Sequence, residues 1–128
     1  LRTILAGRAA EEVVYGKGDI SLSSGGGQSS DLAVATQTAT NVICTSGFGT
    51  DGSLHWTSTP TSAQLKQIDA LLRRAYRAAV VLLRANRVVL DRISAALVEH
   101  QELDGAAVRA LLAGPPVRPG RSTRDKAR

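Results

Sequence analysis

The sequence has few aromatic residues, one cysteine and no long hydrophobic run, and each shortage excludes a class of protein. Only four of its 128 residues are aromatic, so the core must be aliphatic, and we expect neither a β-sandwich nor a base-stacking nucleic-acid fold. The single cysteine, Cys44, excludes an internal disulfide framework and a cysteine-based zinc finger. No stretch approaches the roughly 18 apolar residues of a membrane-spanning helix, and the first residues do not resemble a signal peptide.

Positive charge is concentrated at the C-terminus. The formal net charge is +5, but residues 115–128 hold five Lys or Arg residues against one Asp, so the rest of the chain is nearly neutral. This segment has little apolar surface with which to offset the entropy of ordering. We therefore predict a helical domain over residues 1–113 and a disordered basic tail over residues 114–128. Nucleic-acid binding by the tail would collapse with salt; it ranks last among the functions considered, and we expect no nucleic-acid partner.

Apolar residues at helical spacing fill most of the remaining sequence. The pattern predicts five helices: one over residues 3–15, one from Ser29 or Ser30 to about residue 46, one from a Thr61–Gln64 capping box to Asn86, one after Asn86, and a short one from Asp104 to Leu112. No strand is predicted, so the fold class is all-α. Two long helices with a short joint predict a small helical domain with a long antiparallel helical hairpin.

The connections and the buried faces can also be predicted. Residues 17–30 contain three consecutive glycines and five serines, a composition typical of a mobile loop. In the connection over residues 48–60, we expect Leu54 and Trp56 to anchor onto the core. Helical periodicity places Leu65 on the buried face of the third helix, and Leu97 and His100 on that of the fourth.

Asp31 is the most suggestive titratable residue, because it lies where the glycine-rich loop turns into a helix. A carboxylate at a helix start is stabilised by about 0.3–1 kcal/mol through the helix dipole, so composition alone favours a structural role. Glu11 and Glu12 are adjacent on the first helix and point about 100° apart. Only one of them can face an interior site, and we expect the other to be solvated.

The remaining candidate groups have structural explanations. The glycines at positions 25–27 are not followed by Lys and Ser or Thr and not preceded by a hydrophobic strand, so they do not form a P-loop. His55 and His100 belong to no pattern that places two imidazoles on one helical face, so we expect structural or surface roles for both. Cys44 lies in the second helix, where a small buried hydrophobic residue explains it.

Several strings resemble the peptidase domain of the FtsH family of ATP-dependent zinc metalloproteases. They are LAGRAAEEVVYG from Leu5 to Gly16, SGGG followed by SDLAVAT ending at Thr36, and GFG at residues 47–49, with AYRA, LLRANR and ELDG further on. The similarity covers roughly residues 1–113. It implies an FtsH peptidase-like helical fold.

This resemblance also implies functional residues. Asp31 matches the third zinc ligand, and Glu11 matches the acidic residue that supports the zinc-binding histidines. The HExxH motif of the family, which supplies two ligands and the general base, does not occur in these 128 residues. We expect it upstream of Leu1, so no catalytic residue is expected on this chain, and the chain by itself should be inactive.

The parent protein implied by the resemblance is a metalloendopeptidase that degrades unfolded or misassembled proteins. Its cofactors would be zinc, at a site incomplete here, and ATP in a missing ATPase domain. Its partners would be protein substrates and further copies in a hexamer. It would lie in the cytoplasm or at the cytoplasmic face of a bacterial inner membrane, with membrane contact only through a missing N-terminal region. The rival interpretation is a non-catalytic helical interaction or oligomerisation module, a decayed peptidase remnant.

Overall fold

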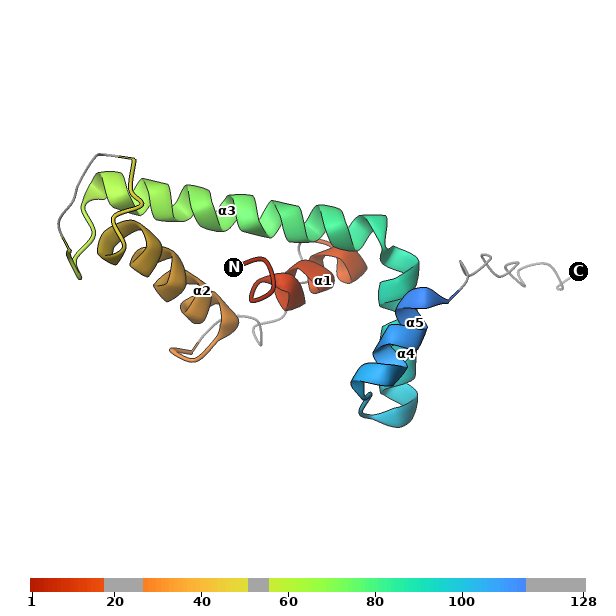
Figure 1. The fold of residues 1–128 in the computed structure, drawn as a ribbon. Coiled ribbons are helices and arrows are strands. Elements are labelled where there is room, and N and C mark those ends of the chain that lie inside the picture. The colour runs from red at the N-terminus through yellow and green to blue at the C-terminus, as the bar shows by residue number, and fades with distance from the viewer. Residues whose placement is uncertain (18–26, 51–55, 115–128) are drawn as a thin grey trace, which may run out of the picture. The chain divides into compact units, whose positions relative to one another are not determined.

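The computed structural model describes residues 1–17, 27–50 and 56–114, and its regular structure within these ranges is entirely helical (Figure 1). The all-α prediction is therefore confirmed. The chain divides into two compact units, Leu1–Ala85 and Asn86–Arg128. The elements in chain order are α1 (Ala6–Tyr15), α2 (Asp31–Thr40), the π-helical turn η2 (Asn41–Thr45), α3 (Ser62–Ala85), α4 (Arg87–His100) and α5 (Gly105–Ala113).

Local hydrogen bonds fix the starts of α2 and α3 where the sequence predicts them. The Ser30 hydroxyl accepts a hydrogen bond from the Ala33 amide at 3.3 Å, which identifies Ser30 as the N-cap of α2. Before α3, the Gln64 amide donates to the Thr61 hydroxyl at 3.2 Å, and the Thr61 amide donates to Gln64 Oε1 at 2.9 Å. This reciprocal pair is the predicted capping box. α1 starts later than predicted, because residues 2–5 form turns before Ala6.

The long helix α3 is the support of the first unit, because α1, α2 and η2 all pack against it (Figure 1). Many of the contacting side chains are alanines, which allow the helix backbones to approach closely. Each alanine buries little area, but the close approach gives dense packing. Three small clusters form the core along α3. They consist of Ala39, Ile43, Cys44 and Ile68; of Leu5, Ala35 and Ala75; and of Ala9, Ala79 and Val80.

Threonine hydroxyls bond to the backbone along the second helix. Thr36, Thr38 and Thr40 each donate to the carbonyl four residues earlier, at 2.7, 2.8 and 2.9 Å. Such bonds compete with helix geometry and often bend helices. The helix widens into η2 directly after the last of these residues, and Gly47 follows with a φ of 70°. The sequence predicted the extent of this helix but not its final π-helical turn.

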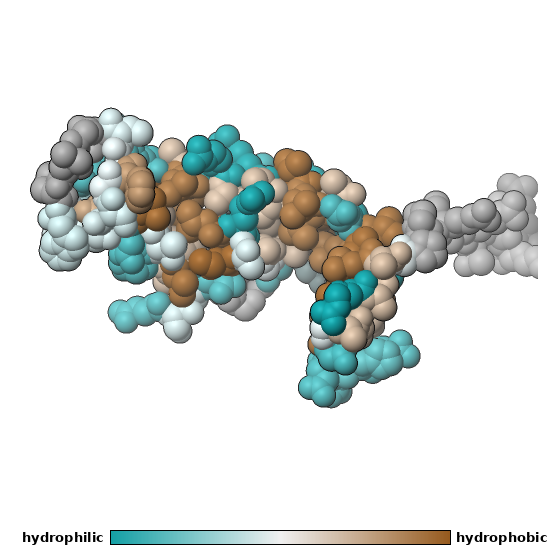
Figure 2. Space-filling model, viewed as in Figure 1, coloured by the Kyte–Doolittle hydropathy of each residue, from teal (hydrophilic) through white to brown (hydrophobic). Residues whose placement is uncertain are grey.

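Two predictions about buried side chains in the first unit are wrong. Leu65 is 54% exposed and Trp56 is 70% exposed. Gln64 and Ile68 are buried instead, and since they are four residues apart they share one face of α3, from which Leu65 is rotated by about 100°. The connection before α3 is held to the core by the Thr57 amide, which donates to the Cys44 carbonyl at 3.2 Å, rather than by the indole ring. In the view of Figure 2, hydrophobic residues in brown reach the surface alongside hydrophilic ones.

The second unit contains α4 and α5. Asn86 separates α3 from α4 as predicted, and the Asp104 carboxylate caps α5 by accepting from the Ala107 amide at 2.7 Å. No residue of α4 or α5 is buried. Leu97, at 42% exposure, and His100 therefore do not occupy the predicted inward positions. The predicted hairpin spans the junction of the two units and stays a prediction.

Three predictions fall outside the described ranges. They concern most of the glycine-rich loop, the side chains of Leu54 and His55, and the basic tail beyond Gly114. Within the described part of the chain, no helix is both long and apolar enough to cross a membrane.

Candidate functional site

Asp31 is the first residue of α2, directly after the Ser30 cap, and its side chain is exposed. Because the cap hydrogen bond fixes the helix start, the carboxylate is carried on a rigid element rather than on the loop before it. Its charge lies at the N-terminal, positive end of the helix dipole, which is favourable for a carboxylate. The structure thus places the Asp31 carboxylate at a fixed and exposed position at the start of α2.

Gly7 of α1 lies beside this carboxylate. A methyl group added at Gly7 would be 3.9 Å from Asp31 Oδ2, so the first helix passes within van der Waals range of the start of the second. Glu11 is four residues after Gly7 and shares its face of α1. It is half-buried. Glu11 is thereby on the side of α1 that Asp31 approaches, whereas Glu12 is on another side.

Glu12, rather than Glu11, is the buried member of the adjacent pair. It is 8% exposed. The Tyr76 hydroxyl donates to Glu12 Oε2 at 2.8 Å, and Arg84 Nη2 donates to Oε1 at 3.4 Å. The expectation that one of the two glutamates is withdrawn from solvent is met by Glu12, which bonds to α3.

Sequence reasoning missed this interior carboxylate, although a signal existed. Leu5, Ala9 and Glu12 follow one another at intervals of four and three residues, and all three are buried. That spacing places Glu12 on the same stripe as the core residues Leu5 and Ala9. A charged residue on a buried stripe needs a partner, and here Tyr76 and Arg84 of α3 supply it.

The hydroxyl of Tyr76 is strongly affected by this environment. Burial, followed by the hydrogen bond to Glu12 and the charge of that carboxylate, raises the pKa of Tyr76 to about 12. Removal of the phenolic proton would create a second anion beside Glu12. Tyr76 therefore remains a hydrogen-bond donor throughout the physiological pH range.

The residues available for metal binding are limited. Among residues 1–17, 27–50 and 56–114, no group of three His, Cys, Asp or Glu side chains is arranged to hold a metal ion. Cys44 is 1% exposed within the core, as predicted for a small hydrophobic residue. Asp31 fits a zinc site as one hard oxygen ligand, and the other ligands of such a site would have to come from outside the described ranges.

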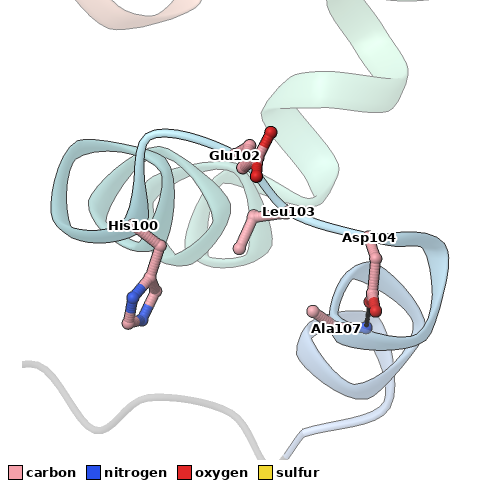
Figure 3. Close-up of a pocket in the computed structure, with 5 residues that line it drawn as sticks. All are labelled: His100, Glu102, Leu103, Asp104 and Ala107. Atoms are coloured by element: carbon pink, nitrogen blue, oxygen red, sulfur yellow. Dashed lines mark hydrogen bonds between the residues drawn. The ribbon is translucent and has the colours of Figure 1, made fainter.

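The hollow beside His100 in the second unit does not form a metal site either (Figure 3). It measures about 540 Å³ and is lined in part by Glu102 and Asp104. In Figure 3 the Glu102 carboxylate lies on the side away from the imidazole, and the Asp104 carboxylate lies beside Ala107 rather than beside His100. The Asp104 carboxylate is engaged by the Ala107 amide at the start of α5, so it serves as a helix cap.

Comparisons with known proteins identify the class of protein to which this helical segment is similar. The ATP-dependent zinc metalloprotease FtsH of a Synechococcus strain is 30% identical over 84% of this chain. FtsH 1 of Symbiobacterium thermophilum is 37% identical over 88% of the chain, and FtsH of Methylibium petroleiphilum is 35% identical over 89%. No family model matches the chain, and no solved structure matches it significantly.

All three relatives are zinc metalloproteases by name, and the similarity runs through nearly the whole chain. The chain is therefore similar to FtsH proteins over 84–89% of its own length. It spans about a fifth of the length of these relatives, between 19% and 21%.

Proposed function

We propose that this chain is the C-terminal part of the peptidase domain of an ATP-dependent zinc metalloendopeptidase, and that Asp31 is the carboxylate ligand of its zinc ion. The observation that carries the proposal is the position of Asp31, exposed on a capped helix start and directly beside α1. A bound zinc ion would supply a water of lowered pKa and polarise the substrate carbonyl. The contribution of this chain is to hold one ligand oxygen in a fixed place.

Glu11 is proposed as a positioning residue for the same site. It shares a face of α1 with Gly7, which lies beside Asp31, and it is half-buried. A carboxylate in that position can accept a hydrogen bond from the second ring nitrogen of a zinc-binding histidine and so orient the imidazole. The histidines themselves would come from an HExxH segment outside these 128 residues.

The full activity proposed for the parent protein is the degradation of unfolded or misassembled proteins, driven by ATP in a separate domain. We propose that it works as a hexamer on protein substrates, at the cytoplasmic face of a bacterial inner membrane or in the cytoplasm. The relatives, named as ATP-dependent zinc metalloproteases, support the use of ATP and zinc.

The test uses the parent protein with its HExxH segment and compares Asp31→Asn with Asp69→Asn. Asp69 is a matched control, because it is an exposed aspartate on α3 that pairs with Arg73 at 2.7 Å. Asp31→Asn should lose bound zinc and the ability to degrade unfolded casein, whereas Asp69→Asn should keep both. Full zinc content in purified Asp31→Asn would remove Asp31 from the site.

Glu11→Gln provides an intermediate case. Loss of a group that orients a ligand typically weakens metal affinity by about 10- to 100-fold. We expect zinc to be removed from this variant by a chelator concentration that leaves the parent protein loaded. If chelator sensitivity is unchanged, Glu11 does not position the ligands.

A second candidate function is a non-catalytic interaction module, and the second unit favours it. No residue of α4 or α5 is buried, and Val98 is 85% exposed. Helices without a buried side of their own are suited to packing against another surface. The coding sequence upstream of Leu1 distinguishes the two candidates, since a protease requires an HExxH motif and an ATP-binding motif there.

A further inference from the structure

A cleft of about 500 Å³ lies between α1 and α3 in the first unit, away from the proposed zinc ligand. One wall contains Glu12, in the last turn of α1, and Lys17, which is two residues after the end of that helix. The other wall is formed by α3. Neither Asp31 nor Glu11 lines this cleft. Its chemistry can therefore be considered independently of the zinc site.

The buried carboxylate at this cleft is already neutralised. Glu12 accepts hydrogen bonds from the Tyr76 hydroxyl and from Arg84, whose side chain is itself 61% exposed. Because both carboxylate oxygens have a donor, Glu12 does not require a cation from a ligand. The Glu12 carboxylate is thus not available to neutralise other positive charges of the cleft.

The rim of the cleft is cationic. Among the described residues, Lys17 and Arg77 make no ion pair, and both side chains are exposed. Arg73 is paired with Asp69, but both of these side chains are largely exposed, and an exposed pair of this kind is weak enough to exchange partners. The cleft therefore offers several cationic groups to an incoming anion.

Aliphatic surface lies beside these cations. Val81 is 67% exposed and Val80 lines the cleft next to it. An anion without apolar groups would leave this surface in water, whereas a ligand with aliphatic and acidic groups side by side would cover both. A stacked nucleic-acid base would need a free aromatic face, and Tyr76, the ring in this cleft, is half-buried with its hydroxyl bonded to Glu12.

We propose that the cleft between α1 and α3 binds an acidic peptide segment, with glutamate or aspartate side chains next to aliphatic ones. The carboxylates pair with Lys17 and Arg77, and the aliphatic side chains cover Val81. The partner is thus a protein segment of defined chemistry rather than a phosphate-containing polymer.

The test measures binding of fluorescein-labelled ten-residue peptides to the 128-residue chain by fluorescence anisotropy. One peptide alternates Glu and Leu, and its control alternates Gln and Leu. We expect the acidic peptide to bind more tightly by about tenfold or more, since it adds several ion pairs at the rim, and its affinity should fall as salt is raised.

A pair of double variants with equal charge changes locates the site. In the cleft variant, Lys17→Glu and Arg77→Glu reverse two cations of the rim. In the control variant, Arg2→Glu and Arg74→Glu reverse two cations that line a separate hollow with Leu71. The cleft variant should weaken binding of the acidic peptide by about tenfold or more, through loss of attraction and new repulsion, and the control variant by much less.

Circular dichroism shows whether both variants retain the helical content of the parent chain, which is expected because the altered side chains are exposed. Equal weakening by the two variants would indicate a nonspecific charge effect and overturn the proposal. It would also be overturned if the Gln peptide binds as tightly as the Glu peptide, or if a single-stranded oligonucleotide binds more tightly and shows the same dependence on Arg77.

Discussion

The Tyr76→Phe substitution tests whether the bond between α1 and α3 stabilises the first unit. It removes one oxygen atom and leaves the ring in place, so packing is preserved. The atom that is lost donates to Glu12 Oε2 at 2.8 Å. Glu12 is 8% exposed, so water cannot readily replace the missing donor, and the carboxylate would retain Arg84 at the longer distance of 3.4 Å.

The size of the effect follows from the charge of the acceptor. A hydrogen bond to a charged group contributes about 1.5–3 kcal/mol, and loss of a partner to a buried group costs a comparable amount. We expect Tyr76→Phe to lower the free energy of unfolding by about 1.5–3 kcal/mol, measured by urea denaturation with circular dichroism at neutral pH. Tyr15→Phe is the matched control, because Tyr15 is 67% exposed, and it should change stability by about 0.5 kcal/mol or less.

A double-mutant cycle with Glu12→Gln assigns the loss to the pair. If the two side chains interact as described, the double variant should be more stable than the sum of the two single effects predicts, by about 0.5–3 kcal/mol. Equal effects of Tyr76→Phe and Tyr15→Phe, together with an additive cycle, would refute the reasoning that this bond stabilises the unit.

Three further predictions concern the same unit. The pKa of Tyr76 is raised to about 12 by burial and by Glu12, above the value of about 10 for an unfolded tyrosine. The contribution of the Tyr76 hydroxyl to the stability of the fold is therefore fully present below about pH 10 and is lost as pH rises through 12. Between pH 9 and pH 11.5, the free energy of unfolding measured by urea denaturation should fall more for the parent chain than for Tyr76→Phe. Equal decreases for the two proteins would contradict this. Gly16 has φ 98° and ψ 169°, so Gly16→Ala should lower the free energy of unfolding by about 1–3 kcal/mol. Gly27 has open space around it, so the control variant Gly27→Ala should not be destabilised. Equal melting temperatures of the two variants would exclude backbone strain at Gly16. Gly7→Ala should raise the free energy of unfolding by about 0.5–1 kcal/mol, because alanine is the better helix former. The added methyl group would be 3.9 Å from Asp31 Oδ2, which is an ordinary van der Waals contact. A lower melting temperature would show that α1 and α2 cannot accommodate the methyl group.

The candidate site was predictable only in part. The resemblance carried by the strings around Asp31 and Glu11 indicates which residues to examine, and the structure adds that Asp31 is exposed beside Gly7. The partners of Glu12 could not be predicted, because Tyr76 and Arg84 are 64 and 72 residues away in the chain. No local pattern relates residues at such separations.

Several helix boundaries were determined by the sequence itself, because capping and helix breaking involve neighbouring residues. The Thr61–Gln64 box, the Asp104 cap and the break at Asn86 all occur where the local pattern places them. Only the tertiary structure decided which of several apolar faces is buried. Ile68 packs on η2 while Leu65 remains exposed, since burial depends on which helix side meets a neighbour, and that contact is made between segments distant in the chain.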